Sequence, residues 1–336
     1  MRDDLLHVVT AVFNPCRWQS RIRLARDFIG QMRQAGLPLT VVETAYGNQP
    51  FELADIPDIR HVPTRAATPL WCREAAINVG IRSLPPDTRY VAWIDADITF
   101  ERRDWAAETI AALQTYAVVQ PWSEALDLGP DGEPMEVWGA HVRTSFGRVW
   151  CENGRLPNWR KQMEAGEPYT VPHSGYAWAA TMGFLNAVGL LLDTEIVGGA
   201  DIRMALGVVG RKDLSLRPFK NPSHRAHIAA WCDRAFRYGE ARLGYVPGRI
   251  AHTWHGDKSK RLHRERFGIL NNFQFDPATD IYCNRWGITE LAGNKPEMQR
   301  AIEAYFRHRD EDATTRAAGT DENIDPFLRA SLERQA

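Results

Sequence analysis

The chain contains few cysteines, and their arrangement excludes two ways of stabilising a small fold. The five cysteines are scattered over 336 residues and show no C-x-x-C spacing. Disulfide frameworks and zinc knuckles both need paired or closely spaced cysteines. We therefore expect free thiols and a reducing compartment.

The chain also lacks long apolar runs. No segment approaches the roughly 20 apolar residues that a membrane-spanning helix needs. The N-terminal residues 1–4 lead directly into an apolar, β-rich run, so no signal peptide is expected. We predict a cytoplasmic protein that does not insert into a membrane.

A strong overall charge is absent as well, because 41 Lys and Arg residues stand against 42 Asp and Glu residues. No overall field therefore favours nucleic acid or an anionic membrane as a partner. Residues 203–266 nevertheless carry a clear excess of Arg and Lys. This stretch predicts a local patch for a phosphate-bearing partner.

What the chain does have is a regular alternation of strand-like and helix-like segments. Apolar β-rich runs alternate with segments whose apolar residues recur at helical spacing. In order, they cover residues 5–13, 17–35, 39–42, 71–84 and 90–94. This order predicts an α/β fold with a parallel sheet and right-handed crossovers, in one large domain or two smaller ones.

The later part of the chain is less regular. Residues 105–116 predict a helix, and the following stretch to about residue 170 is rich in Gly, Pro and Trp. Such stretches are typical of substrate-side loops and an inserted antiparallel ribbon. Residues 175–192 predict a strand and a helix beneath the site. The tail from residue 307 is polar, with a weak helix at 326–334 that is either mobile or docked on a neighbour.

Two carboxylates, Asp95 and Asp97, follow the apolar run at residues 90–94. This run predicts a buried parallel strand, and open α/β sheets bind ligands at the carboxyl ends of such strands. A pair of carboxylates there can hold a divalent cation, which in turn holds a diphosphate. Asp310 and Asp312 repeat the pattern in the polar tail, where we expect only a solvated charge cluster.

Five short segments resemble the nucleotide-sugar glycosyltransferases of the GT-A fold, most closely the branch related to the beta-1,4-galactosyltransferases. They are TAVFNP at 10–15, WCREAAINVG at 71–80, WIDAD at 93–97, IVGGAD at 196–201 and HTWH at 252–255. The second and third are the most specific. The resemblance implies a Rossmann-like, mostly parallel central sheet flanked by helices, with a small antiparallel insertion on the acceptor side.

The resemblance also implies a division of the chain and an activity. The glycosyltransferase domain would cover residues 1–275, with a donor half at 1–120 and an acceptor half at 121–275. Residues 276–336 would form a C-terminal helical extension and polar tail. The implied activity is metal-dependent transfer of a sugar from a nucleotide sugar, UDP-linked, to an acceptor hydroxyl with inversion at the anomeric carbon.

For the donor, the resemblance implies roles for five residues. Phe13 and Asn14 would lie near the uridine, and Glu43, at the end of the second strand, would meet the base or ribose. Arg73 would contact phosphate or ribose through its guanidinium fork, and Asn78 belongs to the same segment. Without the resemblance, Arg73 is interpreted as a surface helix residue paired with an acid, and Asn78 as a polar residue in helix packing.

The metal set is implied in the same way. Asp97 would coordinate the ion, and Asp95 would either join it or meet the ribose or a metal-bound water. His252 and His255 would supply the remaining ligands, although an ordinary loop histidine is an equal interpretation for His252. An imidazole beside carboxylates favours Mn²⁺ over Mg²⁺. Lys258 would then contact the diphosphate.

Asp201 is the base that the resemblance implies, because it follows the turn Gly198-Gly199. It would remove the proton from the acceptor hydroxyl, although a helix N-terminus lowers a carboxyl pKa and burial must offset that effect. An Asp after Gly is also a common helix N-cap. Val197 and Ala200 stand where the galactosyltransferase pattern has a Trp and a second acid, which leaves the acceptor sugar open.

Tryptophans supply the other recognition signal, because sugars and bases stack on aromatic faces. We expect one or two of the following to touch substrate: Trp71, Trp93, Trp122, Trp138, Trp150, Trp159 and Trp178. The acceptor is either a soluble glycan or glycolipid headgroup, or a hydroxymethylated pyrimidine in phage DNA, which the basic stretch would suit. The expected source is bacterial or phage.

Two other classes of protein remain open. A nucleotidyltransferase would share the sheet and the metal-held nucleotide, but it usually has a Gly-rich phosphate loop after the first strand, and the sequence has none. A non-catalytic sugar-binding relative would bind the donor without turnover.

Overall fold

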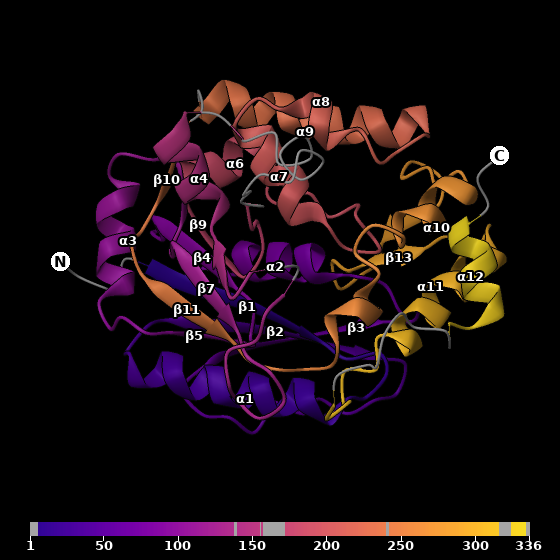
Figure 1. The fold of residues 1–336 in the computed structure, drawn as a ribbon, viewed down its shortest axis with the longest axis horizontal. Coiled ribbons are helices and arrows are strands. Elements are labelled where there is room, and N and C mark those ends of the chain that lie inside the picture. Colours follow the sequence, from indigo (N-terminus) through magenta and orange to yellow (C-terminus); the bar gives the residue numbers. More distant parts are fainter. Residues whose placement is uncertain are drawn as a thin grey trace.

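A seven-stranded sheet forms the centre of the molecule (Figure 1). The structure, a computed structural model, describes residues 6–137, 140–154, 156, 172–239, 242–315 and 324–333. From edge to edge the strands are β3 (Arg60–Ala66), β2 (Leu39–Tyr46), β1 (Leu6–Phe13), β4 (Tyr90–Ile94), β9 (Ala177–Thr181), β6 (Val118–Gln120) and β10 (Leu243–Tyr245). Strand β9 is antiparallel to both neighbours, and the other pairs are parallel. The predicted α/β class with a mostly parallel central sheet flanked by helices is confirmed.

Alternate residues of the central strands face two separate cores. Leu6, Val8 and Val12 of β1 pack on the side of α1 (Gln19–Gln34) and α3 (Trp105–Leu113). Val9 and Phe13 face the opposite core, which includes residues of the following helices: α2 (Arg73–Arg82), α6 (Met182–Val188), α7 (Ala200–Val208) and α9 (Pro222–Gly239). Because both faces of β1 are buried, its sequence is a nearly continuous apolar run and does not alternate between apolar and polar residues.

A smaller sheet lies beside the carboxyl end of β4. Its strands, in order, are β5 (Ile98–Phe100), β11 (Arg249–His252), β7 (Glu124–Asp127) and β8 (Val142–Thr144). Strand β11 is antiparallel to β5 and parallel to β7, so the expected antiparallel insertion is a mixed sheet. The register pairs His252 with Ile98 on one side and with Asp127 on the other, which brings three distant parts of the chain together.

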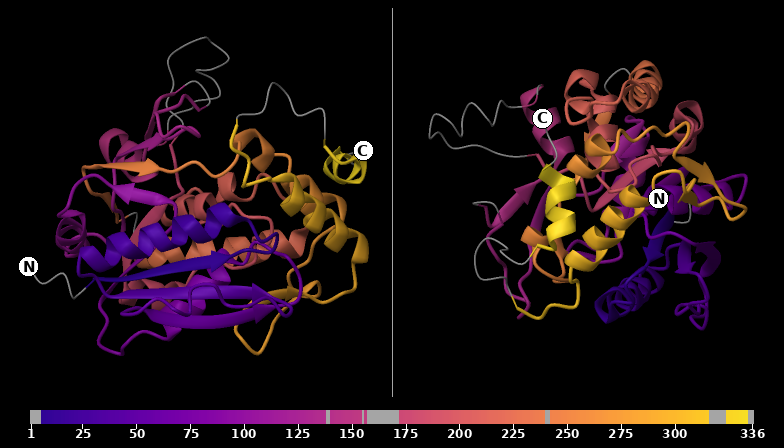
Figure 2. Two further views of the ribbon diagram at one scale, coloured as in Figure 1. Left: turned by 90° about the horizontal axis from the view of Figure 1, so that it is seen from below. Right: turned by 90° about the vertical axis from the view of Figure 1, so that its right-hand side faces the viewer.

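The C-terminal part packs against the rest of the chain. Figure 2 shows its yellow helices, α11 (Pro296–His308) and α12 (Pro326–Glu333), side by side at one end of the molecule. Tyr305 and Phe306 of α11 belong to the same buried cluster as Val9 and Phe13. Of the two alternatives for the last helix, docking is the one observed, because Asn272 donates to the Ser331 carbonyl. The division of the chain at residue 275 stays a prediction.

The remaining elements are short. They are α4 (Phe146–Asn153), α8 (Lys212–Ser215), the 3₁₀ helix η2 (Lys258–Arg261), α10 (Phe267–Asn272), β12 (Ile281–Cys283) and β13 (Thr289–Leu291). Strands β12 and β13 form an antiparallel hairpin. Among the described helices, none has the length and apolar character needed to cross a bilayer.

Candidate metal centre

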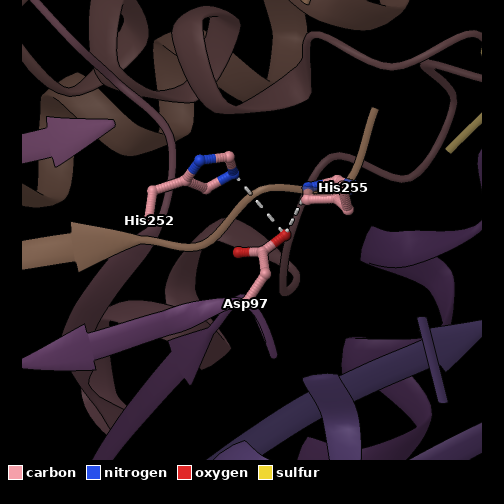
Figure 3. Close-up of side chains that lie close together, drawn as sticks. All are labelled: Asp97, His252 and His255. Atoms are coloured by element: carbon pink, nitrogen blue, oxygen red, sulfur yellow. Dashed lines mark ion pairs between the residues drawn. The ribbon is translucent and has the colours of Figure 1, made fainter. Parts of the chain in front are cut away.

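Three of the predicted metal ligands meet where β4, β5 and β11 end or begin. Asp97 lies in the turn between β4 and β5, His252 is the last residue of β11, and His255 follows three residues later. The Nε2 atom of His255 lies 2.9 Å, and that of His252 3.8 Å, from Oδ2 of Asp97 (Figure 3). One ligand atom from each side chain falls within 4.8 Å of the others.

This donor set fits a divalent transition cation. Two imidazoles and one carboxylate combine borderline and hard ligands, a set compatible with several first-row divalent ions, Mn²⁺ and Fe²⁺ among them. The second oxygen of Asp97, Oδ1, is buried and has no hydrogen-bond partner among the described residues. A buried carboxylate oxygen without a partner is costly, and a bound cation would satisfy it.

A buried carboxylate lies close to the Nδ1 atom of each of the two histidines. Oδ1 of Asp127 lies 3.2 Å from Nδ1 of His252, and Oε2 of Glu311 lies 3.2 Å from Nδ1 of His255. The side chains of both acids are at most 1% exposed. A carboxylate on the far nitrogen fixes the orientation of a metal-binding imidazole. Glu311 holds the His255 ring in this way, whereas Nδ1 of His252 lies near Asp127 without a hydrogen bond to any described residue.

The surroundings of this centre favour the ionised form of Asp97 and the neutral form of His252. Burial alone would raise the pKa of Asp97, but the charge of His252 and the hydrogen bond from His255 lower it well below its usual range. Burial, reinforced by Lys258, lowers the pKa of His252 to about 4, against the pull of Asp97 and Asp127. A neutral imidazole and an ionised carboxylate are the forms that bind metal.

Two basic side chains border the centre. The Lys258 ammonium donates to Asp127 and, at 3.0 Å, to the Tyr176 hydroxyl, and burial lowers its pKa to about 8. Its predicted contact with a diphosphate is untested. Sequence reasoning missed Arg261, whose Nη2 lies 3.0 Å from Nε2 of His255. The basic run after His255 was the only signal for it.

Asp95 is not one of the three converging side chains and pairs with Arg73 instead. Its Oδ1 accepts a hydrogen bond from Nε of Arg73 at 2.6 Å, and Arg73 also donates to Glu74 at 2.9 Å. Arg73 is only 7% exposed, so its interpretation as a surface helix residue is wrong. Burial raises the pKa of Asp95 to about 6 and that of Glu74 to about 7, with Arg73 opposing both shifts.

Asp201 lies near this second acidic group. It is the second residue of α7, and the N-cap is Gly199, so the interpretation of Asp201 as an N-cap is wrong. Gly199 has a φ of 100°, and a Cβ there would lie 2.8 Å from the Phe267 ring. Oδ2 of Asp201 accepts from the Ser174 hydroxyl at 3.3 Å. The attraction of Asp95, Glu74 and Asp201 raises the pKa of Arg73, against the effect of burial.

The predicted uridine contacts lie beside the same edge of the sheet. Phe13 ends β1 and meets Trp71 edge-on, with 5.2 Å between ring centroids, while the Arg21 guanidinium lies 4.7 Å over its ring. Asn14 bonds locally, because its side chain accepts from the Trp18 amide and donates to the Trp18 carbonyl. A donor role for Phe13 or Asn14 is untested.

The side chains of Glu43 and Asn78 make internal hydrogen bonds. Glu43 accepts from the amides of Glu52 and Leu53 and from His61, so it fixes the loop after β2. Asn78 exchanges two hydrogen bonds with the backbone of Leu191. The packing interpretation of Asn78 agrees with this geometry, and the donor roles of both residues stay predictions.

Most of the described tryptophans are buried. Trp122 and Trp178 donate their ring N–H groups to backbone carbonyls, and Trp93 is 3% exposed. Trp71 and Trp150 are partly exposed, and Trp71 is the one beside the donor motifs. Trp138 and Trp159 lie outside the described residues.

The expectation of only a solvated cluster at residues 310–312 holds for the exposure of Asp310 and Asp312 but is wrong for Glu311 between them, which is buried. Asp312 accepts from the backbone amides of Gln19 and Ser20 at the start of α1, a position where α1 has no capping side chain of its own. Glu311 and its neighbour Arg309 are 1% and 2% exposed. The tail is buried here because it lies between α1 and the loop after β11, a contact that no local pattern reveals.

The fold and this centre define an α/β protein with a candidate metal site at the carboxyl ends of its sheet strands. No family model and no curated protein matches the chain. Among solved structures it is similar to Drosophila beta1,4-galactosyltransferase 7 in complex with xylobiose, with 9% identity, a TM-score of 0.34, and coverage of 72% of this chain and 64% of that one. The chain thus spans less than two thirds of the length of that structure.

Two other structures show similarly distant likeness. S. aureus TarS 1-349 in complex with UDP-GlcNAc has 9% identity and a TM-score of 0.44, with 97% of this chain and 78% of that one covered. The 4-diphosphocytidyl-2C-methyl-D-erythritol synthase of Anaerococcus prevotii has 12% identity and a TM-score of 0.33, with 74% and 90% covered. Likeness at this level carries no argument about activity, which has to rest on the site.

Proposed function

We propose that the protein is a metal-dependent glycosyltransferase that uses a nucleotide sugar, UDP-linked, as donor and transfers the sugar to an acceptor hydroxyl with inversion. The observation that carries this proposal is the convergence of Asp97, His252 and His255 at the carboxyl end of β4. The motif resemblance of this chain to GT-A glycosyltransferases gives the site its chemical interpretation.

The residues around the centre divide into two groups with complementary tasks. Asp97, His252 and His255 would hold Mn²⁺, which when bound supplies the positive charge that neutralises a diphosphate leaving group. Lys258 and Arg261 add cationic charge beside it. These five side chains would bind and orient the donor at the diphosphate.

Asp201 is proposed as the base that accepts the proton of the acceptor hydroxyl. It lies near Arg73, Glu74 and Asp95, whose mutual charges are described above. Attack from the side opposite the diphosphate gives inversion. Asp201 is half-buried and accepts a hydrogen bond from the Ser174 hydroxyl.

The acceptor remains one of two classes, a soluble glycan or a hydroxymethylated pyrimidine in DNA. Part of the basic excess at 203–266 is inside the protein, because Arg203 and Arg266 are 6% and 7% exposed. Other basic residues of this stretch are exposed, among them Arg217, Lys220, Arg234, Arg237, Arg242 and Arg264. A basic surface that could contact a DNA phosphate backbone therefore remains, and both acceptor classes stay open.

A single assay tests the proposed function. The intact chain is incubated with a panel of UDP-sugars and Mn²⁺, with and without glycan or duplex DNA acceptors, and the released nucleotide is identified. We expect UDP release that stops on addition of a chelator. Release of pyrophosphate from a nucleoside triphosphate and a sugar phosphate would instead identify a nucleotidyltransferase, and donor binding without turnover a non-catalytic relative.

A further inference from the structure

Residues 309–313, which we call the C-terminal strap, lie between the start of α1 and the loop that carries His255. At one side, Asp312 accepts from the Gln19 and Ser20 amides at 2.9 and 2.8 Å. At the other side, Nε1 of Trp254 donates to the Ala313 carbonyl at 2.6 Å. The strap therefore joins two segments from different parts of the chain.

The backbone beside His255 is shaped to receive the strap. Gly256 has a φ of 81°, and a Cβ at this position would lie 2.6 Å from the Asp310 carbonyl oxygen and 2.9 Å from the Glu311 Cα. A side chain at residue 256 would push the strap away. The close approach of the two backbones is thus built into the residue that directly follows His255.

Glu311 is the strap residue that reaches the metal centre. Its carboxylate is fully buried and accepts from two guanidinium groups, those of Arg21 at 2.6 and 2.8 Å and of Arg309 at 2.7 Å. Two such partners keep it ionised, and an ionised carboxylate only accepts hydrogen bonds. The remaining contact of Oε2 is Nδ1 of His255 at 3.2 Å.

This contact selects one form of the His255 ring. An ionised acceptor at Nδ1 keeps a proton there, so Nε2, which hydrogen-bonds Asp97, is the nitrogen on which a cation would replace the proton. Nε2 is the atom that lies 2.9 Å from Oδ2 of Asp97. Asp127 of β7 lies equally close to Nδ1 of His252 but makes no hydrogen bond to it, whereas Glu311, from the extension after α11, does so to His255.

We propose that Glu311 is a positioning residue of the metal centre, and that the C-terminal strap completes this centre by holding the His255 ring with Nε2 toward the cation. The proposal rests on the proposed function only in requiring that Asp97, His252 and His255 bind a divalent metal. It means that a segment outside the predicted glycosyltransferase domain is needed for metal affinity.

Calorimetric titration of Mn²⁺ into the intact protein, without donor, tests this role. We expect Glu311→Ala to weaken Mn²⁺ binding by about 10- to 100-fold, the usual effect of losing a residue that orients a ligand. Glu311→Gln keeps the length and an acceptor oxygen, so it should recover part of the loss. Asp310→Asn is the matched control in the same strap, because Asp310 is 50% exposed, pairs with Lys260, and has a φ of 42° that Asn tolerates.

The Asp312→Ala variant distinguishes an effect on the orientation of His255 from an effect on packing of the strap. It removes the hydrogen bonds between the strap and the start of α1 but leaves the contact between Glu311 and His255 in place. We expect a lower Tm but a smaller loss of Mn²⁺ affinity than in Glu311→Ala. In the Co²⁺-loaded protein, Glu311→Gln should shift the visible absorption bands, while Asp312→Ala should not. If Glu311→Ala does not fold, the Glu311→Gln spectrum and affinity decide the question.

The outcomes are distinct. Wild-type affinity for Mn²⁺ in both Glu311 variants, with an unchanged Co²⁺ spectrum, overturns the role of Glu311 and leaves the metal centre intact. An equal loss of affinity in Asp312→Ala and Glu311→Ala shows that the strap acts by packing alone, which also overturns it. Absence of Mn²⁺ binding in the wild-type protein contradicts the proposed function itself.

Discussion

Two segments of the chain carry the same D-x-D pattern, residues 95–97 after β4 and residues 310–312 after α11. In the first, the outer acids make the contacts: Asp95 pairs with Arg73, and Asp97 faces the histidines. In the second, the middle residue is the one that points inward, because Glu311 is buried while Asp310 and Asp312 lie at the surface. The two segments meet at His255, where Asp97 contacts Nε2 and Glu311 contacts Nδ1.

The comparison shows that the place of the backbone in the fold determines which residues of a D-x-D pattern are buried and what they contact. Residues 95–97 follow a central strand, whose paired neighbours fix the direction of each side chain. Residues 310–312 follow a helix through a residue in the left-handed region, Asp310, with a φ of 42°. The first location was predictable as a ligand site, and the second was not. Four predictions test the contrast, from the largest effect to the smallest.

Asp97→Ala should have the largest effect. Because the carboxylate is the ligand between the two imidazoles, its loss should abolish Mn²⁺ binding and turnover together. The measurements are Mn²⁺ calorimetry and UDP release, with Asp310→Asn as the matched acid from the other copy. Comparable activity in Asp97→Ala and Asp310→Asn would contradict the claim that residues 95–97, and not residues 310–312, supply a metal ligand.

Asp201→Asn should slow the chemical step while leaving the metal centre intact. The amide keeps the size of the side chain but cannot accept the proton, so kcat should fall by about 10²- to 10⁴-fold. Calorimetry should show unchanged affinity for Mn²⁺ and for UDP. Full turnover in this variant would show that another acid is the base. Glu74 would then be the first acid to substitute.

His255→Ala and His252→Ala should both weaken Mn²⁺ binding, each by on the order of 10²-fold, because each removes a ligand rather than its support. UDP affinity measured with Mn²⁺ should fall in parallel, since the ion bridges the protein and the diphosphate. A change in His255→Ala alone would leave His252 as a buried residue of β11 without a metal-binding role.

Asp312→Ala should have the smallest effect, and on stability rather than on chemistry. It removes the acceptor for two amides at the start of α1, and loss of such a cap typically costs about 1 kcal/mol. Urea unfolding followed by circular dichroism measures the change. The same midpoint as in the wild-type protein would restore the expectation of a solvated cluster.

Much of the fold could be predicted from the sequence, because the first half has strong apolar runs and clear helix ends. Strand β3 was missed since it contains Pro63 between charged and polar residues, a composition that an edge strand tolerates. The small strands β6, β7 and β8 lie in the stretch predicted as loops and an inserted antiparallel ribbon, and they could not be placed individually because each has only three or four residues. Such strands are defined by their partners rather than by a periodic pattern.

The candidate site shows the same limit. Asp97, His252 and His255 could be predicted because each lies in a motif next to a strand. Their supports, Asp127 and Glu311, belong to no motif, and they are brought in by sheet register and by the docking of the tail. Sequence spacing carries no information on such contacts, so the acids that orient the histidines emerge only from the folded chain.

Calorimetric titration of UDP into the intact protein, with saturating Mn²⁺ and again with a chelator, tests the central claim most directly. The account predicts one UDP per chain in the presence of Mn²⁺, and at least about 10-fold weaker binding without it, because the cation held by Asp97, His252 and His255 would carry the diphosphate contact. Equal UDP affinity under both conditions, or no UDP binding under either, would contradict it.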